Sequence, residues 1–143
     1  MTRYLLDTNL LNEVVRPAPS DTLVAWLAEQ RDADLFIATF SLAEMRRGLL
    51  QLPAGRRRAD LKAWFLGPEG PPSLFKGRIL GFDELAAEVW AELMAEGQIA
   101  GRPRSALDMI IAAVAKANGC VLASANERHF AGVVDFLNPT RSI

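Results

Sequence analysis

Short apolar runs alternate along this chain with longer segments whose apolar residues recur every three or four positions. The short runs are typical of buried parallel strands, and the longer segments of amphipathic helices. Strands are predicted at residues 3–6, 35–39, 78–80, 121–123 and 134–137. Strands that alternate with helices predict an α/β fold, in which a mostly parallel sheet carries helices on both faces.

The helical segments are bounded by residues that favour helix ends, such as Ser20 before the second helix and Asn118-Gly119 after the last. Helices are predicted at residues 10–15, from 20 onward, 41–52, 56–66, 83–95 and from about 107 to 117. We expect Leu85 to be buried by the helix at 83–95, and Leu107 by the helix that follows. Residues 67–73 and 97–105 are predicted to be loops because they are rich in glycine, proline and polar residues.

Length and composition predict a single domain spanning residues 1–143, with half of its residues hydrophobic. The longest apolar run, 109–115, is too short to cross a bilayer, and no uninterrupted apolar stretch suggests a signal peptide. The single cysteine, Cys120, excludes an internal disulfide and is consistent with a reducing cytoplasm. We therefore expect a cytoplasmic protein that does not associate with membranes.

The net charge of −1 gives no global attraction to nucleic acid, but the basic residues are unevenly distributed. Thirteen of the sixteen are arginine, and Arg46, Arg47, Arg56, Arg57 and Arg58 crowd into one short stretch. The planar guanidinium suits bidentate contact with phosphates, although a run of this kind can also be a solvated helix face.

Three carboxylates stand where a strand or loop leads into a helix. Asp7 follows the first apolar run, and in open α/β sheets ligands bind just beyond the carboxyl ends of the strands. Taken alone, Asp7 serves equally well as a helix cap. Glu44 taken alone is better explained by a capping box with Ser41, and Asp108 also has an alternative as a helix N-cap.

Read together, the three carboxylates predict a cation site. Convergent carboxylates are hard oxygen ligands suited to Mg²⁺ or Mn²⁺. The chain has no cysteine and histidine cluster for zinc, since His129 is its only histidine. It also lacks a Walker lysine motif, a dinucleotide glycine fingerprint and a nucleophile elbow.

Several short motifs occur in an order and spacing that together are specific. They are Leu6-Asp7-Thr8-Asn9, Ser41-Leu42-Ala43-Glu44 with Arg47-Gly48, Gly101-Arg102-Pro103, Leu107-Asp108-Met109-Ile110-Ile111-Ala112-Ala113 and Asn138-Pro139. On these motifs, essentially the whole chain resembles the PIN-domain ribonucleases, specifically the VapC-type toxins of bacterial toxin–antitoxin pairs.

The resemblance implies a single PIN domain, a three-layer sandwich with a five-stranded parallel sheet of order 3-2-1-4-5. It implies Mg²⁺- or Mn²⁺-dependent endonucleolytic cleavage of RNA. On matching positions, Asp7, Glu44 and Asp108 carry over as the acidic metal site and catalytic residues. Thr8, Asn9 and Ser41 carry over as supporting polar groups. A VapB-like antitoxin protein, which would block the acidic pocket with a basic side chain, and a homodimer or higher homo-oligomer are also expected.

One position departs from the family pattern. The family often has a fourth acidic residue after the fourth strand, where this chain has Asn126. Asparagine is a neutral oxygen ligand, so a second metal would be held more weakly, or only when an RNA phosphate adds charge. We expect the neighbouring Glu127 to point elsewhere and His129 to be structural or on the surface.

The resulting hypothesis is metal-assisted hydrolysis of an RNA phosphodiester. A metal held by Asp7 and Asp108 would lower the pKa of a bound water. Glu44 would orient that water or a second metal, or act as general base. The predicted contacts to the RNA backbone are Arg46, Arg47, Arg102 and Arg104, which would make binding depend on salt.

Two other functions fit parts of the pattern. A catalytically inactive module could keep the PIN fold for partner binding, although intact carboxylates at three positions count against it. A phosphatase or phosphotransferase could use Asp7 as nucleophile. Such sites use a second aspartate two residues after the nucleophile, where this chain has Asn9.

Overall fold

The computed structural model describes residues 1–141 and contains one parallel sheet of order β3-β2-β1-β4-β5. The strands are β1 (Tyr4–Leu6), β2 (Leu35–Ala38), β3 (Ile79–Leu80), β4 (Val121–Ala123) and β5 (Phe136–Leu137). β1 lies in the centre, where Leu6 is in register with Ile37 of β2 and with Ala123 of β4. The predicted α/β class, the parallel sheet and the strand order are confirmed.

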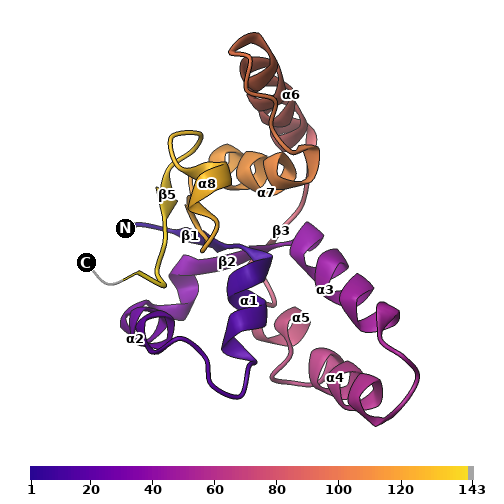
Figure 1. The fold of residues 1–143 in the computed structure, drawn as a ribbon. Coiled ribbons are helices and arrows are strands. Elements are labelled where there is room, and N and C mark those ends of the chain that lie inside the picture. The colour runs from indigo at the N-terminus through magenta and orange to yellow at the C-terminus, as the bar shows by residue number, and fades with distance from the viewer. Residues whose placement is uncertain (142–143) are drawn as a thin grey trace.

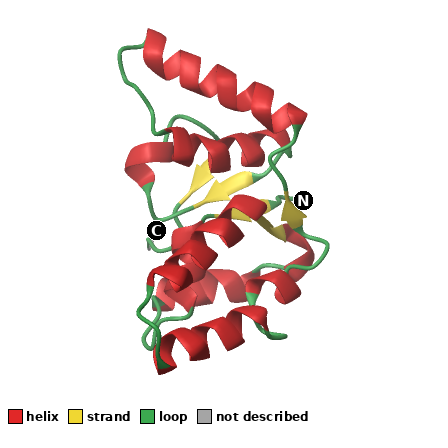
Figure 2. Cartoon of the chain, turned by 90° about the vertical axis from the view of Figure 1, so that its right-hand side faces the viewer, coloured by secondary structure: helices red, strands yellow, loops and turns green. Residues whose placement is uncertain are grey.

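Helices cover both faces of this sheet, as Figures 1 and 2 show. They are α1 (Thr8–Val14), α2 (Asp21–Glu29), α3 (Thr39–Gln51), α4 (Arg56–Leu66), α5 (Pro71–Leu74), α6 (Glu84–Ile99), α7 (Ala106–Ala117) and α8 (Glu127–Phe130). A 3₁₀ turn at Asp32–Asp34 precedes β2. Over residues 1–141, no helix combines the length and the apolar character that crossing a bilayer requires.

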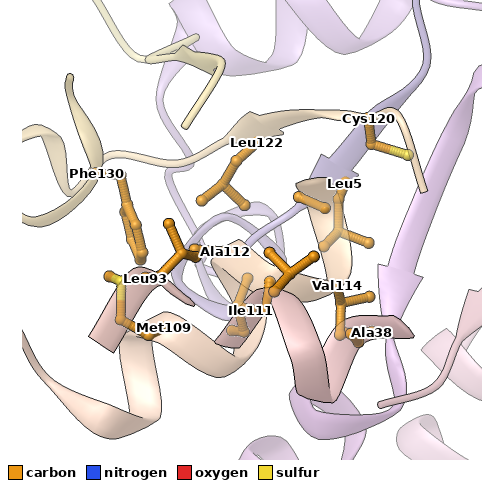
Figure 3. Packing of buried hydrophobic residues seen from close by; sticks show 14 residues of the cluster. Leu5, Ala38, Leu93, Met109, Ile111, Ala112, Val114, Cys120, Leu122 and Phe130 are labelled. Atoms are coloured by element: carbon orange, nitrogen blue, oxygen red, sulfur yellow. The ribbon is translucent and has the colours of Figure 1, made fainter. Parts of the chain in front are cut away.

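The alternation of side chains along each strand divides the core into two clusters. Leu5 and Leu122 face α6, α7 and Phe130 of α8, and Figure 3 shows these side chains meeting Ala112 and Val114 of α7. On the opposite face, Leu6, Leu35, Ile37 and Ala123 pack against α1 to α4 and against Phe75, which directly follows α5. The helix residues buried in this cluster are Leu10, Leu11, Leu23, Met45, Leu49 and Phe65. Because both faces are covered, the polar residues that follow β1, β2 and β4 are left at the carboxyl edge of the sheet.

The prediction of a loop at 97–105 is wrong at its start, because α6 continues to Ile99. Gly97 lies buried inside the helix, where a Cβ atom would come within 2.9 Å of the carbonyl oxygen of Arg102. Glycine there allows close packing and does not end the helix. The change of direction comes at Gly101, whose φ of +71° favours glycine.

Three further predictions are corrected. The segment 67–73 is not wholly a loop, since α5 begins at Pro71 and a proline is favoured in the first turn of a helix. Leu85 is 58% exposed and Leu107 is 50% exposed. On α6 the buried positions are Ala86, Val89, Leu93 and Gly97, a stripe displaced by one residue from Leu85.

Candidate active site

Asp7 is buried at the carboxyl end of the central strand, with 7% of its surface exposed. Its backbone N–H donates to the carbonyl of Ala123, which continues the pairing of β1 with β4. Its Oδ1 accepts from the N–H of Thr8 at 2.8 Å, and its Oδ2 accepts from the hydroxyl of Ser124 at 2.7 Å. Asp7 is therefore both the N-cap of α1 and a carboxylate at the edge where α/β sheets bind ligands.

Burial raises the pKa of Asp7 above its ordinary value, because desolvation penalises the ionised carboxylate. The hydrogen bonds from Ser124 and Thr8 lower the pKa in part, while the negative charges of Glu44 and Asp108 raise it further. Within residues 1–141, no lysine, arginine or histidine forms an ion pair with Asp7 or Glu44. This concentration of negative charge around a buried carboxylate favours a bound cation.

Glu44 reaches the site from α3. The hydroxyl of Thr8 donates to its Oε1 at 2.7 Å and lies 2.9 Å from the hydroxyl oxygen of Ser41, which is fully buried. The alternative of a capping box is wrong, because α3 begins at Thr39 and its N-cap, Ala38, has no side-chain bond. Ser41 therefore lies inside the helix, and both Ser41 and Glu44 are directed at the end of β1.

Asp108 lies in the first turn of α7, but it is not the helix cap. Ser105 caps α7 by accepting from the N–H of Asp108 at 3.2 Å. The Oδ2 of Asp108 instead lies 2.5 Å from Nδ1 of His129, which is also 3.0 Å from the amide nitrogen of Asn126. His129 is on the surface as expected, yet it contacts a predicted metal ligand, which its sequence position did not indicate.

Ser124 joins several of the predicted supporting residues, although we did not predict it as a site residue. Besides donating to Asp7, its oxygen accepts from the amide of Asn9 at 3.3 Å and from the backbone N–H of Asn126 at 3.0 Å. The only signal in the sequence was its place directly after a buried strand. Glu127 points elsewhere, as expected, because it binds Asn138 and Arg141.

The three carboxylates fit a divalent cation in chemistry and in charge, but they do not form a closed set of ligands. Within residues 1–141, no three aspartate, glutamate, histidine or cysteine side chains are close enough to share one metal ion. Asp7 and Glu44 are linked through Thr8, whereas one oxygen of Asp108 is held by His129. Asp108 has to release His129 before both of its oxygens are open to a cation.

The four arginines predicted to contact RNA differ in their surroundings. Arg46 and Arg47 lie on α3, the helix that carries Glu44, and Arg102 is exposed in the loop after α6. Arg104 donates to the carbonyl of Leu93 at 2.7 Å and pairs with Glu96 at 3.3 Å. The guanidinium of Arg104 is thus engaged in holding the loop against α6. An RNA contact by any of the four remains a prediction.

Comparison with known proteins extends over nearly the whole chain. The PIN domain family matches residues 4–135. A VapC ribonuclease Y4jK from Sinorhizobium fredii is 35% identical over 136 residues, which are 94% of this chain and 96% of that protein. Toxin FitB from Neisseria gonorrhoeae has the same identity and coverage. A structure of FitAB bound to an IR36 DNA fragment superposes with a TM-score of 0.89 at 33% identity, covering 98% of this chain and 97% of the other.

Proposed function

This chain belongs to the PIN-domain family, and from that premise we propose that it is a Mg²⁺- or Mn²⁺-dependent endoribonuclease, the toxin of a toxin–antitoxin pair. The observation that carries the proposal is the buried, negatively charged environment of Asp7. A buried carboxylate at the edge of the sheet has its pKa raised by burial and by the charges of Glu44 and Asp108. The 35% identity to a VapC ribonuclease supports the choice of reaction, and the 35% identity to toxin FitB supports the role of a toxin.

The metal would supply the Lewis acidity that activates water and neutralises charge developing on the phosphate. Asp7 and Asp108 would hold it once Asp108 releases His129, and Glu44 would orient a water, accept its proton or bind a second metal. Ser124 and Thr8 fix the two oxygens of Asp7 by donating one hydrogen bond to each. These bonds stabilise the ionised carboxylate, which is the form that binds a cation.

We further propose that a VapB-like antitoxin protein inhibits the enzyme by placing a basic side chain at the acidic site. The name of the relative toxin FitB and the FitAB structure support a partner of this kind. An apolar groove of about 370 Å³ runs along α1, the helix that Asp7 caps, and is lined by Leu10, Leu11, Val14, Val15 and Leu74 among others. An antitoxin with a basic residue next to an apolar segment would match both features.

The exposed apolar residues Leu85 and Ile99 on α6 are consistent with a homodimer or higher homo-oligomer, which we also propose. We expect the enzyme to act in the cytoplasm, where its RNA substrate is found. Light scattering coupled to size exclusion would measure the oligomeric state directly.

The test is cleavage of labelled RNA by the purified protein with Mn²⁺ or Mg²⁺, and with EDTA. We expect endonucleolytic products only with metal, and none from Asp7→Asn. Asp21→Asn is the matched control, since Asp21 is an exposed aspartate on α2 whose side chain forms no hydrogen bond or ion pair with the site residues within residues 1–141. Absence of cleavage with either metal, by protein that still binds an antitoxin, would favour an inactive interaction module.

A further inference from the structure

A second cavity opens beside the acidic site, on the side of α6, α7 and α8. Its volume is about 690 Å³, and Asp108 and His129 belong to its lining. The other polar side chains that line it are those of Arg102, Arg104, Arg128 and Ser105. Figure 1 shows α8 lying beside α7, and the contact between His129 and Asp108 joins the two helices. The cavity therefore gathers three arginines next to a predicted metal ligand.

The charge in this cavity is positive, in contrast to the net charge of −1 for the whole chain. Among residues 1–141, Asp108 is the only acidic residue in the lining, and its carboxylate is engaged by His129. Glu96, which is not in the lining, neutralises Arg104. Within residues 1–141, the guanidinium groups of Arg102 and Arg128 have neither an ion pair nor a hydrogen bond. Two exposed arginines thus remain to meet an anion in the cavity.

Two local features fix the shape of the cavity. The N–H of Arg102 donates to the carbonyl of Gly97 at 2.9 Å, and the absence of a Cβ atom at Gly97 lets the 102–104 loop lie directly on α6. The N-terminus of α7, capped by Ser105, also borders the cavity. Unpaired N–H groups and the helix dipole at such an end favour an anion. The arginines and the helix end therefore point to the same kind of ligand.

We propose that this cavity binds a backbone phosphate of the RNA strand next to the phosphodiester being cleaved, with Arg102 and Arg128 as the contacting residues. The proposal rests on the proposed ribonuclease function and adds the direction in which the substrate strand leaves the acidic site. Phosphate contacts of this kind position a strand without reading its sequence. The strand would run from Asp7 past Asp108 toward the loop after α6, with Arg104 and Gly97 as positioning residues.

The test measures binding of a fluorescein-labelled, mixed-sequence single-stranded RNA decamer to the intact protein carrying Asp7→Asn, so that no cleavage interferes. In that background, Arg102→Gln and Arg128→Gln should each weaken binding roughly five- to tenfold. Each should also reduce the slope of log affinity against log salt by about 0.7, the value for one phosphate contact on a single strand. Arg31→Gln is the matched control, because Arg31 is an exposed arginine that pairs with Asp34 and does not line the cavity.

Gly97→Ala tests the shape of the cavity without removing a charge. The added Cβ should displace the 102–104 loop and weaken RNA binding, with the salt slope changing less than in Arg102→Gln. Thermal melting of every variant separates loss of binding from loss of folding.

The results separate the two proposals. If wild type cleaves RNA but both arginine variants bind RNA like Arg31→Gln, the cavity proposal is overturned and the ribonuclease proposal stands. If the arginine variants keep RNA affinity but lose a co-purified antitoxin, the cavity binds an acidic segment of the partner, which also overturns it. If wild type does not cleave RNA and the Asp7→Asn protein does not bind it, both proposals fail.

Discussion

Ser124 donates a 2.7 Å hydrogen bond to Oδ2 of Asp7, although the two residues are 117 positions apart in the chain. The bond connects the ends of β1 and β4, the two adjacent strands at whose carboxyl edge the acidic site lies. Both groups are buried, so water cannot replace the hydroxyl as a donor to the carboxylate. Ser124 thus opposes the desolvation that raises the pKa of Asp7.

Ser124→Ala should therefore raise the pKa of Asp7 further and weaken metal binding. The buried Oδ2 would lose its donor, and a deletion of this kind destabilises a protein by about 1–3 kcal/mol. Calorimetric titration with Mn²⁺ and urea unfolding would measure the two effects. Ser73→Ala on α5 is a control outside the site. Unchanged Mn²⁺ affinity would show that Ser124 supports the fold and not the metal.

Asp7→Asn should change how the stability of the metal-free protein depends on pH. Because folding raises the pKa of Asp7, the protonated side chain stabilises the folded wild type. This contribution to the unfolding free energy is lost as pH rises through the folded pKa. The difference in unfolding free energy between Asp7→Asn and wild type should thus grow in favour of the variant from about pH 4 upward. Urea unfolding in EDTA across this range would measure it.

Added Mg²⁺ should then restore the stability of wild type and leave Asp7→Asn unaffected, because a ligand that binds only the native state stabilises it. A variant that is less stable than wild type at every pH, with metal making no difference, would identify Asp7 as a helix cap only.

Glu44→Gln separates charge from hydrogen bonding at the third carboxylate. Gln keeps a side-chain oxygen for the hydroxyl of Thr8, so we expect the unfolding free energy to stay within about 0.5 kcal/mol of wild type. Cleavage of RNA should fall by orders of magnitude, because the amide neither binds a cation strongly nor accepts a proton. Full cleavage by the Gln variant would restrict Glu44 to a structural role.

The strands and most helices of this fold could be predicted because their signals are local. The apolar run before Asp7 and the one before Ser124 are short and flanked by polar residues, as buried parallel strands are. The order of the strands came from the resemblance to a family and not from periodicity. The extension of α6 through Gly97 could not be predicted, since glycine is read as a breaker unless the neighbouring loop is known.

The three carboxylates could be proposed from the sequence as a candidate site, but their contacts could not. Asp7, Glu44 and Asp108 each follow a strand or loop and could be placed at one edge. The pairing of Asp108 with His129, 21 positions away, depends on how α8 lies against α7, and no local pattern encodes that. The hydrogen bond from Ser124 to Asp7 joins opposite ends of the chain, and no local pattern encodes it either.

Asn126→Asp tests the position at which this chain has an asparagine and the family often has an acidic residue. The amide nitrogen of Asn126 lies 3.0 Å from Nδ1 of His129, the same atom that engages Asp108. A carboxylate at position 126 would compete with Asp108 for His129 and add a negative charge to the site. The metal-free variant should therefore be modestly less stable than wild type, because like charges repel, and Mn²⁺ should reverse that loss.

The same variant should bind Mn²⁺ more tightly by calorimetry without RNA, since Mg²⁺ and Mn²⁺ sites strengthen with ligand charge. His129→Gln is the companion variant, because it frees Asp108 without adding a charge. Tighter metal binding in both variants would show that His129 restrains Asp108 in the metal-free protein. Tighter binding in Asn126→Asp alone would assign the gain to the new carboxylate as a ligand. No change in Mn²⁺ affinity, together with melting that does not respond to metal, would place residue 126 outside the metal site and leave it to Asp7, Glu44 and Asp108.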